Sequence, residues 1–405
     1  MSYDTDIAIV GGGLTGPALA LACARAGLRC DVIDALPAAD RSDPGFDGRA
    51  YALALSSVRM LRALGVWSAV ADHSQPMHDI KVTDGRVGDS AVFLGLHFAS
   101  AEIEEGTMGT MLEDRYLRRA LLTAMEQTPG ITHRPSTRVL GQTCSDTGIT
   151  LDLGDQGPLH ARLVIGADGR RSGTAERAGI TRMGWDYGQT ALVCAIAHDR
   201  PHDGVAHQLF MPSGPLAILP LPGNRSSIVW SEQRALAQAI HALPEADYLQ
   251  VLRPRFGDFL GAISLAGARF TYPLNLTLAR AFTAPRVALV GDAAHGMHPI
   301  AGQGLNAGLR DVAALAQVLG DAHHRGEDIA APDVLDRYAQ WRRFDTASLA
   351  VATDTFNRLF SNDNPILRAG RDLGMGLVNA IPGLRRTAIR EAAGLNGDLP
   401  DLMQG

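Results

Sequence analysis

The alternation of apolar and polar residues predicts that the chain opens with a strand, a helix and a second strand. Residues 7–10 (IAIV) form a short apolar run, which is typical of a buried parallel strand. The alanine- and leucine-rich residues 14–27 predict a helix, and CDVIDA at residues 30–35 predicts the second strand. This order indicates a Rossmann-like α/β domain at the N-terminus.

Strand-rich and helix-rich stretches alternate along the rest of the chain. We expect helices at residues 53–64 and 115–126, short strands at 132–165, mostly strands at 185–273 with one helical insert near 232–256, and mostly helices after residue 290. Because the two kinds of stretch are interleaved, the domains are expected to be discontinuous in sequence.

Composition and charge narrow the class of protein. The chain has 405 residues, of which 46% are hydrophobic and 20% charged, as in globular proteins of two or three domains. The net charge of -6 argues against a general nucleic-acid binder. Four scattered cysteines without a CxxC motif disfavour a disulfide framework and a cysteine zinc site. The start of the chain is unlike a signal peptide, and no apolar run reaches about 18 residues, so we expect a cytoplasmic protein.

The sequence GGGLTG joins the first strand to the first helix. Gly11, Gly13 and Gly16 have the GxGxxG spacing, which allows a tight turn, close approach of the backbone to a pyrophosphate, and packing of the helix on the strand. Leu14 and Thr15 lie at the start of the helix, where free N–H groups can bind phosphate. With the ribose-binding acid Asp34 after the second strand, the pattern predicts a site for NAD or FAD.

Two later strands also end in acidic motifs, RLVIGADGRRS with Asp168 and RVALVGDAAHGMHPIAGQGLN with Asp292. The three motifs, in this order, resemble those of the group A FAD monooxygenases, the flavoprotein aromatic hydroxylases. The resemblance implies FAD rather than NAD as the bound cofactor. It also implies that Asp292 binds hydroxyl groups of FAD, and that backbone N–H groups of Gly304, Leu305 and Asn306 approach the flavin ring.

Further residues of this family pattern would position the flavin. Pro299 and Gly302 would lie beside the flavin face, and no acid or base residue is expected in catalysis. Arg49 and Arg115 match arginines that contact FAD in the family, although each could instead be an ordinary surface arginine. His295 and His298 are poor evidence for a metal site, because they are three residues apart in a glycine-rich loop, and no metal is expected.

Several long stretches, including HPIAGQGLNAGLRD, resemble the ubiquinone-biosynthesis hydroxylases of the UbiH, UbiF and VisC type. This resemblance implies that NADH or NADPH reduces FAD, that O2 forms a flavin C4a-hydroperoxide, and that the aromatic ring of a polyprenylated phenol is hydroxylated. NAD(P)H is expected to dock near Asp168 and Arg170, because the chain has one glycine-rich fingerprint. Substrate-pocket candidates are Gln208, Phe210, Leu219, Pro220 and Leu221, although each could be plain core.

The expected fold is therefore a Rossmann-like FAD-binding domain with an interleaved β-sheet substrate domain and C-terminal helices. The FAD-binding domain comprises residues 1–75, 111–182 and 281–325, the substrate domain 76–110 and 183–280, and the helical region 326–405. Residues 360–395 mix apolar residues with arginines and could contact a membrane surface or a partner in a ubiquinone-biosynthesis complex, or pack on the FAD domain. Two alternatives stay open: a hydroxylase of a small soluble phenol or natural-product scaffold, and a catalytically silent FAD-binding scaffold subunit.

Overall fold

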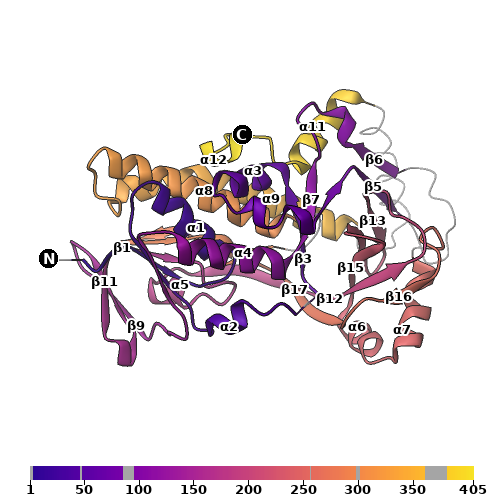
Figure 1. The fold of residues 1–405 in the computed structure, drawn as a ribbon, viewed down its shortest axis with the longest axis horizontal. Coiled ribbons are helices and arrows are strands. Elements are labelled where there is room, and N and C mark those ends of the chain that lie inside the picture. Colours follow the sequence, from indigo (N-terminus) through magenta and orange to yellow (C-terminus); the bar gives the residue numbers. More distant parts are fainter. Residues whose placement is uncertain (1–2, 46–47, 85–94, 256, 298–301, 361–380) are drawn as a thin grey trace.

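A computed structural model describes residues 3–45, 48–84, 95–255, 257–297, 302–360 and 381–405. Within these residues the strands form an eight-stranded sheet, a nine-stranded sheet and a small three-stranded sheet (Figure 1). The small sheet has the order β3 (Ala50–Ala54), β7 (Gly109–Glu113) and β4 (Ser74–Met77). The N-terminus lies at the outer end of the eight-stranded sheet, and the C-terminus lies above the long helices (Figure 1).

The eight-stranded sheet is the expected Rossmann-like sheet. Its main path has the order β18-β19-β11-β1-β2-β8, and β9 and β10 extend it beside β11. The bounds are β1 Thr5–Val10, β2 Cys30–Ile33, β8 Ile131–Arg134, β9 Gly141–Cys144, β10 Ile149–Asp152, β11 Pro158–Gly166, β18 Thr283–Ala284 and β19 Val287–Leu289. The apolar run predicted for the first strand is buried between two parallel neighbours, β11 and β2.

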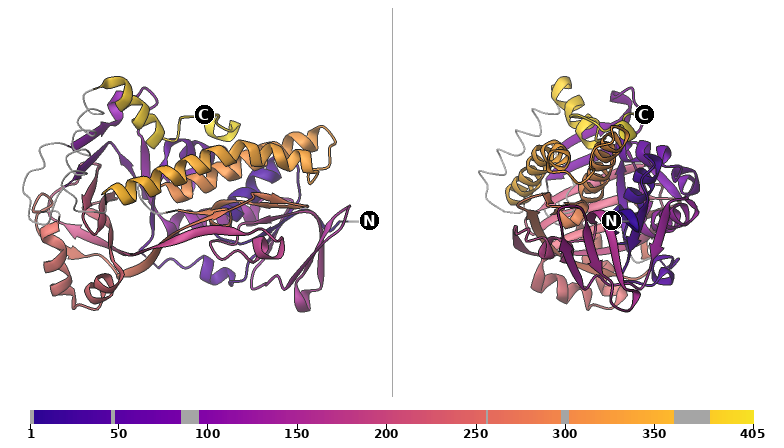
Figure 2. Two further views of the ribbon diagram at one scale, coloured as in Figure 1. Left: turned by 180° about the vertical axis from the view of Figure 1, so that it is seen from behind. Right: turned by 90° about the vertical axis from the view of Figure 1, so that its left-hand side faces the viewer.

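Helices cover the faces of this sheet. Helix α8 packs along α1, and Gly320 allows the close approach, because a Cβ there would lie 3.0 Å from the Cβ of Ala26. Helix α9 runs beside α8, as both views in Figure 2 show. The bounds are α1 Thr15–Arg25, α2 Ala38–Arg41, α3 Leu55–Ala63, α4 Asp114–Gln127, α5 Gly173–Arg177, α8 Gln303–His324, α9 Pro332–Phe360, α11 Pro382–Ala392 and α12 Asp401–Gln404.

The nine-stranded sheet has the main order β20-β17-β12-β15-β14-β13-β5-β6, with β16 beside β12. Its strands are β5 Asp79–Asp84, β6 Gly95–Ala99, β12 Arg182–His198, β13 Val205–Met211, β14 Gly214–Leu221, β15 Arg225–Gln233, β16 Ile263–Leu265, β17 Phe270–Ala279 and β20 His295–Gly296. Strands β5 and β6 come from a separate segment of the chain, which confirms the interleaved architecture. The domain boundaries given above stay a prediction.

The helical insert in this sheet consists of two helices rather than one. Helix α6 (Arg234–His241) ends before Pro244, and Pro244 is the N-cap residue of α7 (Glu245–Leu252). Proline lacks the N–H that a continuous helix would need, so the chain turns at this point. The two helices cover the face of the sheet that carries Trp230 and Leu216.

Helix α11 packs on the protein through Ile389, which lies in a cluster with Leu55 and Met108. Arg385 and Arg390 of this helix form ion pairs with Glu102 and Glu105.

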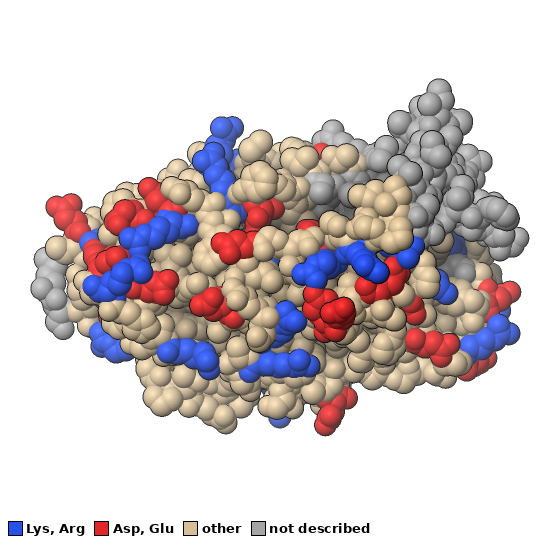
Figure 3. Space-filling model, turned by 90° about the horizontal axis from the view of Figure 1, so that it is seen from above, with Lys and Arg blue, Asp and Glu red and all other residues tan. Residues whose placement is uncertain are grey.

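Residues 361–380, the middle of the segment considered for membrane or partner contact, lie outside the described residues. Among the described helices, none combines the length and apolar character required to cross a membrane. Basic and acidic side chains are intermixed on the face shown in Figure 3.

Because of His207 on β13, we expect the folded state to lose stability in acid. Burial, with a smaller effect of Lys81, lowers the pKa of this imidazole from 6.5 to about 4. The unfolded chain therefore binds a proton at higher pH than the folded chain, and the folded state loses up to about 3 kcal/mol as the pH falls from 6.5 to 4. Urea denaturation at both pH values should show a smaller loss for His207→Gln. Equal losses in the variant and the unchanged protein would contradict this prediction.

Candidate active site

Three parallel strands of the eight-stranded sheet end side by side. The pairing of β1 with β11 sets Val10 opposite Gly166, and the pairing of β11 with β19 sets Gly166 opposite Leu289. The loops that follow these strands therefore start at the same edge of the sheet. In open α/β sheets, ligands bind at the carboxyl edge of the strands.

The glycine loop after β1 is closely packed on one side and open on the other. Gly11 has a φ of 119°, and a Cβ there would overlap the backbone carbonyl of Ala167. A Cβ at Gly16 would overlap the carbonyl oxygen of Gly11. A Cβ at Gly13 would meet no protein atom within 4 Å. Leu14 and Thr15 follow directly as the N-cap and first residue of α1, where free backbone N–H groups can bind an anion.

Asp34 lies directly after β2 and is buried. Its two carboxylate oxygens accept hydrogen bonds from Nε and Nη2 of Arg41 at 2.6 and 2.9 Å. A Cβ at Gly12 would overlap this carboxylate, so the glycine loop and the acid are in direct contact. Sequence reasoning missed Arg41, because an arginine in a short polar segment, here the end of α2, gives no signal of the carboxylate it will meet.

Arg170 connects the motif that contains Asp168 to the motif that contains Asp292. Its Nε donates to Asp292 at 3.0 Å, its Nη1 donates to the Asn275 side chain of β17 at 3.1 Å, and its Nη2 donates to the Met297 carbonyl at 3.2 Å. Asp292 is 41% exposed, so its carboxylate is accessible beside this contact. Asp168 accepts hydrogen bonds from Thr174 through one oxygen, whereas its buried Oδ1 has no partner among the described atoms.

Helix α8 starts beside the same edge. Gly302 has the left-handed φ of 64° and is the N-cap residue. The side chain of Asn306 accepts hydrogen bonds from Ala54 N and Ser57 Oγ at 2.9 and 2.8 Å and donates to the Ala52 carbonyl at 2.8 Å. Since this side chain is occupied in holding β3 and α3, the first turn can offer its free backbone N–H groups to a ligand. Pro299 and His298 lie outside the described residues.

Two buried acids at the junction of β7 and α4 hold the predicted arginines. Asp114 accepts hydrogen bonds from Arg49 at 3.2 Å and from Arg118 at 2.7 Å. Glu113 pairs with Arg115 at 2.7 Å and also with Arg225 of β15 at 3.0 Å. Glu113 thus connects the cofactor side of the molecule to the nine-stranded sheet. The sequence shows these acids as an ordinary Glu-Asp pair, so their role was not predicted.

Strand alternation places four of the five pocket candidates on one face of the nine-stranded sheet. Gln208 is paired with Ala217, and the side chains of Leu219 and Leu221 lie on the same face as Ala217. Phe210 is also on this face, whereas Pro220 is on the opposite face. Whether any of these residues contacts a substrate stays a prediction.

The same face approaches the cofactor edge. Leu221 packs with Met77 and Met111 of the small sheet. Val229, which is partly exposed, lies on the same sheet face as Phe270, and Val193 of β12 lies between the two. A Cβ at Gly48, just before Arg49, would overlap the ring of Phe270. This face of the sheet is therefore adjacent to the segment that carries Arg49.

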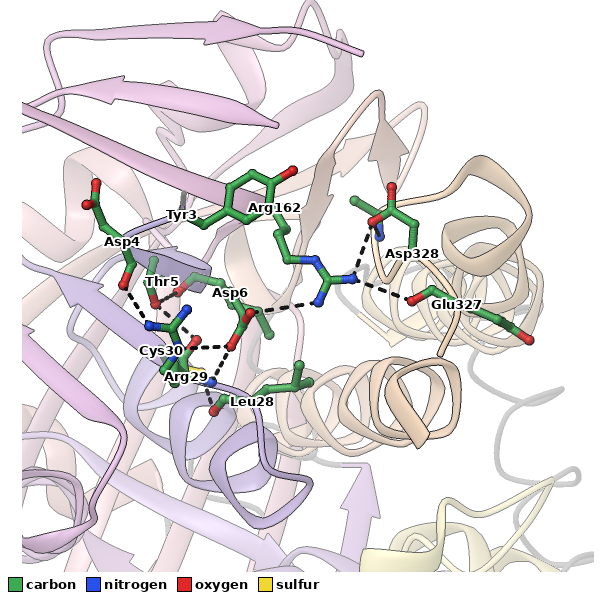
Figure 4. Close-up of polar contacts among 12 residues, drawn as sticks. Tyr3, Asp4, Thr5, Asp6, Leu28, Arg29, Cys30, Arg162, Glu327 and Asp328 are labelled. Carbon is green, nitrogen blue, oxygen red and sulfur yellow. Dashed lines mark hydrogen bonds and ion pairs between the residues drawn. The ribbon is translucent and has the colours of Figure 1, made fainter. Parts of the chain in front are cut away.

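A second cleft, lined by charged side chains, lies at the opposite edge of the eight-stranded sheet, and its arginines are already paired. Figure 4 shows Arg162 reaching from β11 toward Asp6, Asp328 and the Glu327 carbonyl, and Arg29 beside Asp6. The arginines of this cleft are occupied by carboxylates and carbonyl oxygens, which indicates a structural seam. In the described part of the chain, no group of three or more His, Cys, Asp or Glu side chains is placed to hold a metal ion.

The residues at the carboxyl edge fit FAD. Gly13 leaves space for a pyrophosphate, Asp34 lies after β2 against the glycine loop, as a ribose-binding acid would, and the exposed carboxylate of Asp292 can accept hydroxyl groups. The buried Oδ1 of Asp168 still lacks a hydrogen-bond donor among the described atoms. The start of α8 supplies N–H groups and a positive dipole end.

Comparisons with known proteins agree with this geometry. The FAD binding domain family matches residues 4–352. Ubiquinone hydroxylase UbiL of Rhodospirillum rubrum is 45% identical over 99% of this chain and 92% of its own length. The 3-demethoxyubiquinol 3-hydroxylase of Escherichia coli K12 is 36% identical over 96% of this chain and 99% of its own length. The crystal structure of p-nitrophenol 4-monooxygenase PnpA from Pseudomonas putida has a TM-score of 0.78 at 22% identity, and the match covers 98% of this chain and 99% of that one.

The family match spans most of the chain, and both curated relatives align over nearly their full length. The structural likeness to PnpA supports the fold independently of close sequence identity. The chain therefore belongs to the FAD-binding family of aromatic hydroxylases, in the subfamily of the ubiquinone-biosynthesis hydroxylases, and is an FAD-dependent aromatic-ring monooxygenase.

Proposed function

We propose that this enzyme hydroxylates the aromatic ring of a polyprenylated phenol in ubiquinone biosynthesis. The observation that carries the proposal is the full-length similarity to UbiL and to the E. coli 3-demethoxyubiquinol 3-hydroxylase, at 45% and 36% identity. The apolar side chains on the sheet face that carries Leu219, Val229 and Phe270 suit an aromatic ring with an apolar tail.

The site residues have distinct roles in this proposal. The glycine loop and the start of α1 hold the pyrophosphate of FAD, Asp34 holds the adenosine ribose, and Asp168 and Asp292 hold further hydroxyl groups. Arg49 and Arg115 form ion pairs with Asp114 and Glu113, and in this proposal they contact FAD. Backbone N–H groups of Gly304, Leu305 and Asn306 stabilise negative charge on the flavin ring.

When bound, FAD supplies the redox chemistry that takes electrons from NAD(P)H and activates O2 for transfer of one oxygen atom to the ring. The protein contributes orientation of the ring and exclusion of water. Gln208 is the polar side chain among the pocket candidates and can orient a phenol hydroxyl by a hydrogen bond. Arg170 has its guanidinium occupied by Asp292 and Asn275, so we propose that it shapes the NAD(P)H approach rather than gripping the nucleotide.

The substrate must reach the site from a lipid phase, because a polyprenyl tail partitions into membranes. We propose contact with a membrane or with a lipid-carrying partner of the biosynthetic complex. On the face that Figure 3 shows, basic and acidic side chains are intermixed, which argues against a purely electrostatic contact through that face.

Two measurements test the proposed substrate. A deletion strain should accumulate a polyprenyl phenol that lacks one ring hydroxyl, and the intact gene should restore ubiquinone. The purified enzyme should oxidise NAD(P)H faster with a short-chain prenyl phenol than with the same phenol without its tail, by at least about tenfold in kcat/KM, or about 1.4 kcal/mol. Equal rates with both phenols would favour a small soluble substrate, and no stimulation by either would favour a silent scaffold subunit.

A further inference from the structure

A buried network lies directly behind the Gly-Asp turn. His295 Nε2 and Asp311 Oδ2 are 2.5 Å apart, and both side chains are 0% exposed. Asp311 Oδ2 also accepts a hydrogen bond from the backbone N–H of Gly291 at 2.9 Å. Its other oxygen, Oδ1, accepts from Nε of Arg342 at 2.8 Å. The carboxylate thus has three partners from two separate segments of the chain, residues 291–295 and helix α9.

These contacts enclose the residue proposed to bind FAD. Gly291 and His295 are the two ends of a five-residue segment that contains Asp292, and Asp311 holds both ends. Asp311 lies on α8, whose first turn is the other segment proposed to meet the flavin. One side chain therefore sets the distance between the Gly-Asp turn and the start of α8.

The packing around this segment leaves little freedom. A Cβ at Gly308, three residues before Asp311, would lie 3.0 Å from Thr15 Cγ2 and 3.2 Å from the Cα of Gly291. From α9, Tyr338 donates a hydrogen bond to the carbonyl of Leu289 at 2.7 Å, and Arg342 follows one turn later. The glycine loop, the Gly-Asp turn, α8 and α9 thus meet at Asp311.

The charge state of the network is defined by its contacts. Burial raises the pKa of the Asp311 carboxyl, whereas its interactions with His295 and Arg342 lower it. The lowering effects are larger together, so the pKa lies below its ordinary value and the carboxyl stays ionised. Nδ1 of His295 is buried and has no partner among the described atoms. His295 therefore meets Asp311 through Nε2, whereas its Nδ1 makes no contact with a described polar atom.

We propose that Asp311 and His295 are positioning residues for FAD, which hold the Asp292 turn at a fixed place relative to the start of α8. This inference relies on the proposed role of Asp292 but not on the identity of the aromatic substrate. Its test needs no substrate, so its failure can be distinguished from failure of the proposed function.

The test compares two amides at position 295. In His295→Gln the amide can reach Asp311 and donate to it, whereas in His295→Asn the shorter side chain cannot. The dissociation constant of FAD, measured by quenching of flavin fluorescence, should rise at least about tenfold in His295→Asn and stay within about threefold in His295→Gln. The visible flavin spectrum and the midpoint potential should follow the same order.

Asp6→Asn is the matched control, because it breaks the pairs with Arg29 and Arg162 at the far edge of the same sheet (Figure 4). It should lower the melting temperature without changing FAD affinity. If His295→Asn does not fold, Asp311→Asn takes its place and is compared with His295→Gln in the same measurements. Equal FAD affinity of the compared variants, together with an unchanged spectrum and potential, would overturn the inference and leave a purely structural ion pair.

Discussion

Replacing Gly13 with valine is expected to remove FAD binding while the apoprotein still folds. The position is unusual in the glycine loop, because a Cβ there would meet no protein atom within 4 Å, and its φ is not in the left-handed region. The added side chain therefore costs the protein little, within about 1 kcal/mol. It occupies the space assigned to the pyrophosphate, so the dissociation constant of FAD should rise at least about 100-fold, or about 2.7 kcal/mol.

The control for this variant is Gly383→Val on α11, which also meets open space but lies away from the glycine loop. Both variants should show melting curves of the apoprotein close to that of the unchanged chain, and FAD affinity should fall in the Gly13 variant alone. Normal FAD binding by Gly13→Val would show that the pyrophosphate does not cross this loop.

Replacing Val229 with tryptophan is expected to block the aromatic substrate without displacing FAD. Val229 is partly exposed on a central strand and lies on the sheet face of Phe270, which approaches the Arg49 segment. An indole at this place would fill the space proposed for the ring. We expect kcat/KM for the phenol to fall at least about 100-fold, with unchanged FAD content and unchanged slow oxidation of NAD(P)H without substrate.

Leu236→Trp supplies the comparison for added bulk, because Leu236 is exposed on α6, which packs on the outer face of the same sheet. Its steady-state kinetics should match those of the unchanged enzyme. Full activity of Val229→Trp would place the substrate elsewhere, and loss of FAD from that variant would show that the sheet face and the cofactor share more space than proposed.

The parts of the fold that follow from local patterns were predictable from the sequence. The predictions of the first strand, the helix and the second strand were confirmed. All the signals on which they rest, the apolar patterns of strand and helix and the glycine spacing, lie within about 30 residues. The three motifs could be assigned to one edge because each follows a buried strand, and parallel strands in one sheet present the same end to a ligand.

The contacts that hold the site were not predictable, because their partners come from distant segments. Asp34 meets Arg41 at the end of the short helix α2, and Glu113 meets Arg225 from another sheet. Asp311 meets His295 and Arg342 from segments on either side of it. A single carboxylate in a sequence does not indicate which cation will approach it, since that depends on how the helices pack. The division of the predicted helical insert into α6 and α7 had a local signal in Pro244, which was overlooked.

A crystal structure of the enzyme with FAD bound would show whether the three strand ends hold one cofactor. We expect one FAD, with its pyrophosphate against Gly13, its adenosine ribose at Asp34, and its flavin ring between the first turn of α8 and the sheet face that carries Val229. A flavin bound away from these three strand ends, or an Asp292 carboxylate directed away from the cofactor, would contradict this expectation.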